Sequence, residues 1–74
     1  MKKKYKFIGN EESLLELGFV KRDKEFLRFK DGNWLIVVDN NVYTLSRLQR
    51  SDRIETEVIE ELLNLKLVEV ARGY

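Results

Sequence analysis

The side chains best suited to chemistry in this sequence are the carboxylates of Glu57, Glu60 and Glu61, which share part of one predicted helix surface. Grouped carboxylates can bind a metal ion or transfer a proton. The sequence contains no His and no Cys, so the commonest metal ligand, the usual general base near neutral pH and a thiolate nucleophile are all missing. The three carboxylates are therefore interpreted as the solvated face of a helix.

Neither serine nor glycine adds a catalytic pattern. Ser13, Ser46 and Ser51 have no His that could activate a hydroxyl nucleophile. The four glycines are isolated from one another, so no glycine-rich loop is present to bind a phosphate. The sequence predicts no catalytic residue, no cofactor site and no metal site, and hence a protein that is not an enzyme.

Three arginines, Arg47, Arg50 and Arg53, recur at every third position and lead into a predicted helix. A helix N-terminus with nearby arginines can bind phosphate, so these residues are a weaker candidate interaction site. Asp52, Glu55 and Glu57 lie close to them in the sequence, and simple ion pairs with these acids are the competing interpretation.

A stronger candidate combines cationic, aromatic and aliphatic side chains on one face of the predicted sheet. The residues of this candidate interaction surface are Lys4, Lys6, Phe26, Arg28, Lys30, Leu35 and Val37. Its apolar members could form a patch that contacts a protein partner or a second copy of the chain. Its cations could instead neutralise phosphates while Phe26 stacks on a base of a single-stranded nucleic acid. A plain solvated sheet face is the third interpretation.

Two turn signals define the sheet that would carry this surface. Asp-Gly at 31–32 is typical of a type I′ hairpin turn, and Asn-Asn at 40–41 can form a second turn because Asn tolerates positive φ. The two turns predict an antiparallel three-stranded meander. The resulting pairs are Leu27 with Ile36, Phe29 with Trp34, Val38 with Tyr43, and Ile36 with Leu45.

The two registers agree on which residues share a face. The face predicted to carry the core collects Leu27, Phe29, Trp34, Ile36, Val38, Tyr43 and Leu45. The face predicted to stay open collects Phe26, Arg28, Lys30, Leu35, Val37, Thr44 and Ser46. Because a slip by one residue would invert the faces, the candidate surface depends on Trp34 pointing inward and Phe26 outward.

A short first helix is predicted over residues 11–17. Asn10 suits its N-cap, and acidic residues occupy its first turn. Gly18 suits the left-handed position that ends a helix, after which Phe19 can fold back on the last turn.

A second helix is predicted over residues 53–64, because apolar residues recur there with helical spacing. Asp52 and Glu55 have the spacing of a capping box at its start. Strands are predicted at 3–8 and 66–72. The element order is β-α-β-β-β-α-β, which predicts an α+β, two-layer fold with an antiparallel sheet and both helices on one face.

The length and composition limit the function. The 74 residues predict a single domain spanning 1–74, and the net charge of +1 identifies no partner. No apolar run suggests a signal peptide or a membrane span, so a cytoplasmic location is expected. We expect a binding protein whose partner is another protein or a second copy, with nucleic acid as the alternative because only one aromatic residue is placed on the candidate surface. No membrane partner and no small-molecule substrate are predicted.

Overall fold

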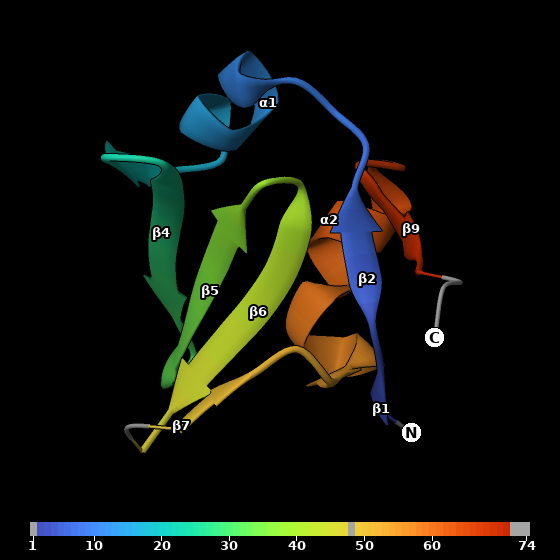
Figure 1. Ribbon diagram of the computed structural model, residues 1–74. Coiled ribbons are helices and arrows are strands. Elements are labelled where there is room, and N and C mark those ends of the chain that lie inside the picture. The colour runs from blue at the N-terminus through green and yellow to red at the C-terminus, as the bar shows by residue number, and fades with distance from the viewer. Residues whose placement is uncertain (1, 48, 72–74) are drawn as a thin grey trace.

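The computed structural model describes residues 2–47 and 49–71, and it shows a small α+β protein with mostly antiparallel strands in open sheets and two short helices (Figure 1). The strands are β1 (Lys2–Lys3), β2 (Tyr5–Phe7), β3 (Val20–Arg22), β4 (Glu25–Lys30), β5 (Asn33–Val38), β6 (Asn41–Ser46), β7 (Gln49–Ser51), β8 (Ile54–Glu55) and β9 (Val68–Val70). The helices are α1 (Glu11–Glu16) and α2 (Glu60–Asn64), and a 3-10 turn, η1 (Thr56–Ile59), precedes α2.

The main sheet has seven strands. Six of them follow the order β3-β4-β5-β6-β2-β9, and β7 pairs with β6 beside this path. β1 and β8 form a separate two-stranded sheet. In Figure 1 the β4–β5–β6 meander lies on one side of the molecule and β2 with β9 on the other, while α1 covers one end. Among the described residues, no helix is long and apolar enough to cross a membrane.

The first hairpin has the predicted register. Phe29 lies opposite Trp34, and the turn between β4 and β5 has positive φ at Asp31 and Gly32, at 52° and 80°. These values match a type I′ turn, in which both central residues adopt the left-handed region. The prediction of a tight turn at 31–32 is therefore confirmed.

The second hairpin differs from its predicted register by two residues. Its turn uses Asp39 and Asn40, with φ of 51° and 65°, and Val38 lies opposite Asn41 instead of Tyr43. Asp can occupy a left-handed position as Asn does, so the sequence allowed either turn. A shift by two residues leaves every side chain on its original face, which is why the faces of β5 and β6 still agree with each other.

The assignment of those faces to core and solvent is wrong. Phe26, Leu35 and Val37 are only 6%, 2% and 3% exposed, whereas Trp34 is 41% and Phe29 is 57% exposed. The face predicted to be open therefore carries the main core. That core consists of Tyr5, Phe7, Leu14, Phe19, Phe26, Leu35, Val37, Val42, Ile54, Ile59, Leu62 and Val68.

The position of β2 explains the inversion. β2 joins β6 through a pairing of Lys6 with Asn41, and its alternating residues Tyr5 and Phe7 are buried while Lys6 is exposed. Because cross-strand partners share a face, Tyr5 and Phe7 lie on the same face as Val42 of β6. The apolar side of β2 thus selects the core face of the whole sheet.

Helix α1 confirms the predicted capping. The side chain of Asn10 accepts a hydrogen bond from the Ser13 amide at 3.0 Å. Gly18 follows the helix with φ of 92°, and the Phe19 amide donates to the carbonyl of Leu14 at 3.0 Å. This 6→1 bond, with the bond from Gly18 to the carbonyl of Leu15, is a Schellman motif. It turns Phe19 into the core, where it is 3% exposed.

The second helix begins later than predicted. Within the range 53–64, Ile54 belongs to strand β8, and the α-helical part starts at Glu60. The predicted capping box does not form, because Glu55 belongs to strand β8 and no helix begins at Asp52. Asp52 instead makes an ion pair with Lys4 at 3.3 Å, and no side chain caps η1 or α2. Strands β3, β7 and β8, each of two or three residues, were not predicted.

Candidate interaction surface

The sheet surface opposite the main core, here called the outer face, is largely apolar. Its members follow from the strand registers, which align residues across β3, β4, β5 and β6. One row consists of Val20, Leu27, Ile36 and Tyr43, and the next of Phe29, Trp34 and Leu45. Val38 is the remaining apolar member. Two adjacent apolar rows make a continuous surface of the kind that contacts partners.

The centre of the outer face is packed, whereas its margin is exposed. Ile36 is 5% exposed although it does not belong to the main core cluster, so outer-face side chains must cover it. Phe29 and Trp34 pack edge to face, with ring centroids 5.2 Å apart. Val20 is 64% exposed. The exposed apolar area is thus concentrated in two aromatic rings and one valine around a buried isoleucine.

Charged residues of both signs border this surface. A third row across the sheet contains Arg22, Glu25, Lys6 and Glu69, so cations and carboxylates alternate along it. From β7, Arg50 places its guanidinium 4.4 Å from the centre of the Tyr43 ring and donates to Glu25 at 3.1 Å. Because β5 and β6 lie between those two strands in the sheet, this ion pair bridges over part of the outer face.

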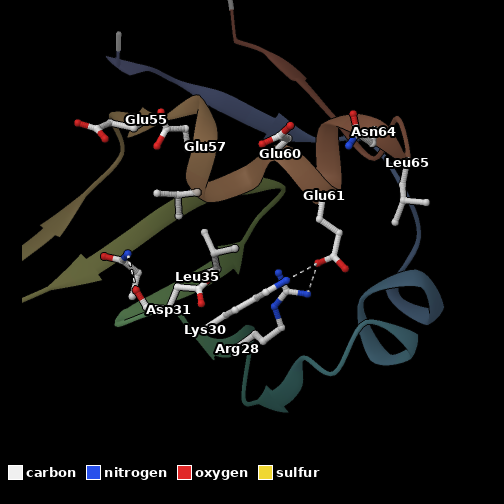
Figure 2. Close-up of a pocket in the computed structure, with 12 residues that line it drawn as sticks. Arg28, Lys30, Asp31, Leu35, Glu55, Glu57, Glu60, Glu61, Asn64 and Leu65 are labelled. Carbon is white, nitrogen blue, oxygen red and sulfur yellow. Dashed lines mark hydrogen bonds and ion pairs between the residues drawn. The ribbon is translucent and has the colours of Figure 1, made fainter.

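A second feature is an open cleft of about 750 Å³ between η1–α2 and the β4–β5 hairpin (Figure 2). Its lining is dominated by charged and polar side chains. Figure 2 shows Glu61 directed from α2 toward Arg28 and Lys30 of β4. The Nζ atom of Lys30 lies 3.7 Å from the carboxylate.

Arg28 is the most buried charged side chain of this cleft, with 11% of its side chain exposed. Its Nη1 atom donates to the carboxylate of Glu61 at 2.7 Å and to the carbonyl of Leu17 at 3.1 Å. Its guanidinium also lies 4.8 Å from the centre of the Phe19 ring. Arg28 therefore links the end of α1, strand β4 and helix α2, which is a structural role.

These contacts perturb the titration of Glu61. The hydrogen bond from Arg28 lowers the pKa of Glu61, partial burial opposes this, and the charges of Arg28 and Lys30 lower the pKa further. Glu61 is thus kept ionised and paired, which does not suit a proton-transfer group at neutral pH. Within 2–47 and 49–71, no three acidic side chains are grouped so as to hold a metal ion.

The residues predicted as one interaction surface lie in three different places. Phe26, Leu35 and Val37 are in the core. Arg28 and Lys30 line the cleft. Lys4 and Lys6 lie beside β9, where Lys6 pairs with Glu69 in the strand register and Lys4 makes the ion pair with Asp52. The structure does not bring these seven residues together on an open sheet face.

The weaker arginine site is also dispersed. Arg47 occupies a turn after β6 with φ of 50°, Arg50 lies over Tyr43, and Arg53 precedes β8. None of the three stands at the start of α2, which begins at Glu60. The competing interpretation, an ion pair, holds for Arg50, but its partner is Glu25 of β4.

The outer face was missed because its aromatic residues were predicted to be core. The signal that could have identified it is the run from Trp34 to Val38, which is apolar on both faces of one strand. Such a strand leaves apolar side chains on whichever face the helices do not cover.

No family model matches this chain, and comparisons with curated proteins and with solved structures find no significant match.

Proposed function

We propose that this protein is a small, non-enzymatic, cytoplasmic binding module that associates with a second copy of itself through the outer face of its sheet. The observation that carries the proposal is the exposure of Phe29 and Trp34 beside the buried Ile36. Exposed aromatic side chains next to a packed apolar centre are typical of interface cores, where Trp and Tyr contribute much of the binding energy.

The proposal treats the molecule as two layers, with both helices on the core side. Leu14 of α1 and Leu62 of α2 belong to the same core cluster as Phe26, which supports this arrangement. Trp34 then lies on the outer face of the sheet, which neither α1 nor α2 covers. A sheet that is apolar on both faces needs a second covering layer, and another copy of the same sheet can supply it.

The size of the surface supports a weak dimer. From the exposed fractions of Val20, Phe29 and Trp34, together with the partly exposed neighbours, the apolar patch presents roughly 400 Å², within the range of the largest patch on a monomer, which is often functional. Two such patches with their charged borders would bury roughly 1,200 Å², the lower limit for a specific interface. A dissociation constant between roughly 10 µM and 1 mM is therefore expected.

The charged border suits a two-fold arrangement. Arg22, Glu25, Lys6 and Glu69 alternate in sign along one row. In an isologous contact the same patch meets itself, so a border with both signs can place each cation near a carboxylate of the other copy. A border of one sign would repel its own copy.

Analytical ultracentrifugation tests the proposal. We expect the parent protein to shift from monomer to dimer as its concentration rises from about 5 µM to about 1 mM. Phe29→Lys places a charge in the patch and should remain monomeric, whereas Leu15→Lys, at a residue of α1 that is 52% exposed, should behave as the parent does. A parent protein that stays monomeric throughout this range would contradict the proposal.

The nucleic-acid alternative loses its predicted surface. Phe26, the aromatic residue expected to stack on a base, is 6% exposed, and Arg28 is engaged by Glu61 and Leu17. A cationic site elsewhere on the chain is needed if nucleic acid is a ligand.

A further inference from the structure

A depression of about 250 Å³ lies where β1 meets the segment that leads into β8 and the end of β9. Every charged residue that lines it is cationic. Its lining consists of Lys2, Lys3, Lys4, Arg53, Val70 and Ala71. This group, here called the basic depression, contrasts with the cleft of Figure 2, where carboxylates outnumber the cations and both cations pair with Glu61.

Backbone pairing holds the cations of the basic depression in place. Lys3 lies opposite Ile54 in the β1–β8 ladder, and Ile54 is 1% exposed. The amide of Ala71 donates to the carbonyl of Lys4 at 2.8 Å. The hydroxyl of Ser51 accepts from the amide of Arg53 and donates to the carbonyl of Arg53, both at 3.1 Å. The cationic side chains therefore extend from an ordered backbone.

Few acidic side chains among the described residues pair with the cations of the basic depression. Lys4 pairs with Asp52 at 3.3 Å. Lys2, Lys3 and Arg53 make no ion pair with any of residues 2–47 and 49–71, although Glu55 lies opposite Lys2 in the ladder. Like charges held close together repel one another, and a bound anion relieves this repulsion.

We propose that the basic depression binds the phosphate groups of a single-stranded nucleic acid. Arginine can bond a phosphate with two parallel N–H groups, and lysine binds it as a point charge. Lys2, Lys3, Lys4 and Arg53 all line the same depression, so a strand lying in it can place several of its phosphates near cations.

The surroundings favour a single strand over a duplex or a membrane. Residues 2–47 and 49–71 form no long helix at the basic depression that could enter a major groove. Among the residues that the structure describes, Val70 and Ala71 are its only apolar lining residues, which is little for insertion into a lipid layer. Lys4 also lines a neighbouring depression together with Tyr43 and Asp52.

The salt dependence follows from the number of phosphates contacted. For three contacts to a single strand, the affinity should fall about 20-fold between about 50 mM and about 200 mM salt, because each contact releases a counterion. A shallower dependence would mean that fewer cations take part.

Fluorescence anisotropy with a labelled oligothymidylate of about ten nucleotides tests the proposal. At about 50 mM salt we expect Lys3→Glu combined with Arg53→Glu to weaken binding at least tenfold. The matched control combines Lys24→Glu with Lys66→Glu, two exposed residues outside the basic depression, and it changes the net charge equally. It should lose less than threefold. If the first variant fails to fold by circular dichroism, Lys3→Gln combined with Arg53→Gln replaces it.

Three results would overturn the proposal: no binding by the parent protein at low salt, equal losses in both charge-reversal variants, or tighter binding to vesicles rich in phosphatidylserine than to the oligonucleotide. The outcome is separable from self-association, because Phe29→Lys disrupts the outer face and leaves the basic depression intact. That variant should bind the oligonucleotide as the parent does.

Discussion

Replacement of Arg28 by alanine should be one of the most destabilising single changes outside the apolar core. The side chain is 11% exposed, and it donates to Glu61 at 2.7 Å and to the carbonyl of Leu17 at 3.1 Å. A hydrogen bond to a charged group contributes roughly 1.5–3 kcal/mol, and the part owed to Glu61 is reduced because that carboxylate is 41% exposed. Together with the lost packing on Phe19, we expect a loss of about 3 kcal/mol.

Urea unfolding followed by circular dichroism measures this loss. A chain of 74 residues has a free energy of unfolding of roughly 4–10 kcal/mol, and its urea dependence is about 1 kcal/mol per molar. Arg28→Ala should therefore lower the unfolding midpoint by about 3 M, or leave the protein largely unfolded.

Lys30→Ala is the matched control. Lys30 contacts the same carboxylate, but its side chain is 53% exposed and the ion pair is longer, at 3.7 Å. The loss should stay below about 0.5 kcal/mol. If Arg28→Ala and Lys30→Ala lower the stability by equal amounts, Arg28 does not link α1 to α2 as described.

Three further predictions concern stability. The pKa of Glu61 is lower in the folded protein than its ordinary value of 4.5. The contribution of Glu61 to folding stability is therefore complete above pH 4.5 and is lost as the pH falls through the lower folded pKa. The difference in unfolding free energy between the parent and Glu61→Gln should shrink on acidification. Lys66 has φ of 59° after α2, so Lys66→Gly should stabilise by about 1 kcal/mol in a thermal melt while Lys66→Ala should not. Phe26→Ala should cost about 4 kcal/mol in urea unfolding, whereas Phe29→Ala, on the exposed face, should cost less than about 1.5 kcal/mol.

Local signals predicted the local parts of this fold well. The Asp-Gly turn at 31–32 and its register follow from two residues with the right backbone preference. The start of α1 at Asn10 and its end at Gly18 follow from a capping side chain and a residue without a Cβ atom. Each of these features depends on a few consecutive residues, so the amino-acid sequence alone is sufficient to predict it.

The core face could not be predicted from the meander because both of its faces are apolar. Phe26 and Val37 alternate with Leu27 and Ile36, and alternation alone cannot rank two apolar faces. The core face is determined by β2, whose one lysine lies between two buried aromatic residues, but β2 joins β6 across more than thirty residues of chain. A strand pairing between residues so distant in sequence cannot be predicted from local sequence patterns.

The second helix was overextended for a similar reason. Ile54 fits the apolar stripe of the predicted helix, and it is buried as that stripe requires. However, Ile54 is buried as part of strand β8 opposite Lys3. A helix and a strand at this position both bury the Ile54 side chain, so the spacing of apolar residues could not distinguish the two.

The prediction of the candidate sites depended on which sheet face carries the core and on where the second helix begins. Because the faces are inverted, the residues of the predicted basic face are divided among the core, the cleft and the region beside β9, and the aromatic face becomes the exposed one. The cations of the basic depression come from β1, from Lys4 directly after it, and from the segment before β8. Their proximity depends on a strand pairing that the sequence did not reveal.

The fluorescence of Trp34, the single tryptophan of the chain, tests self-association through the outer face most directly. At about 5 µM its emission should be that of a partly hydrated indole, and it should move to shorter wavelength as the concentration approaches about 1 mM, in parallel with dimer formation. Phe29→Lys should abolish the shift. Emission that stays unchanged over this range, or that already indicates a fully buried ring at the lowest concentration, would contradict the proposed interface.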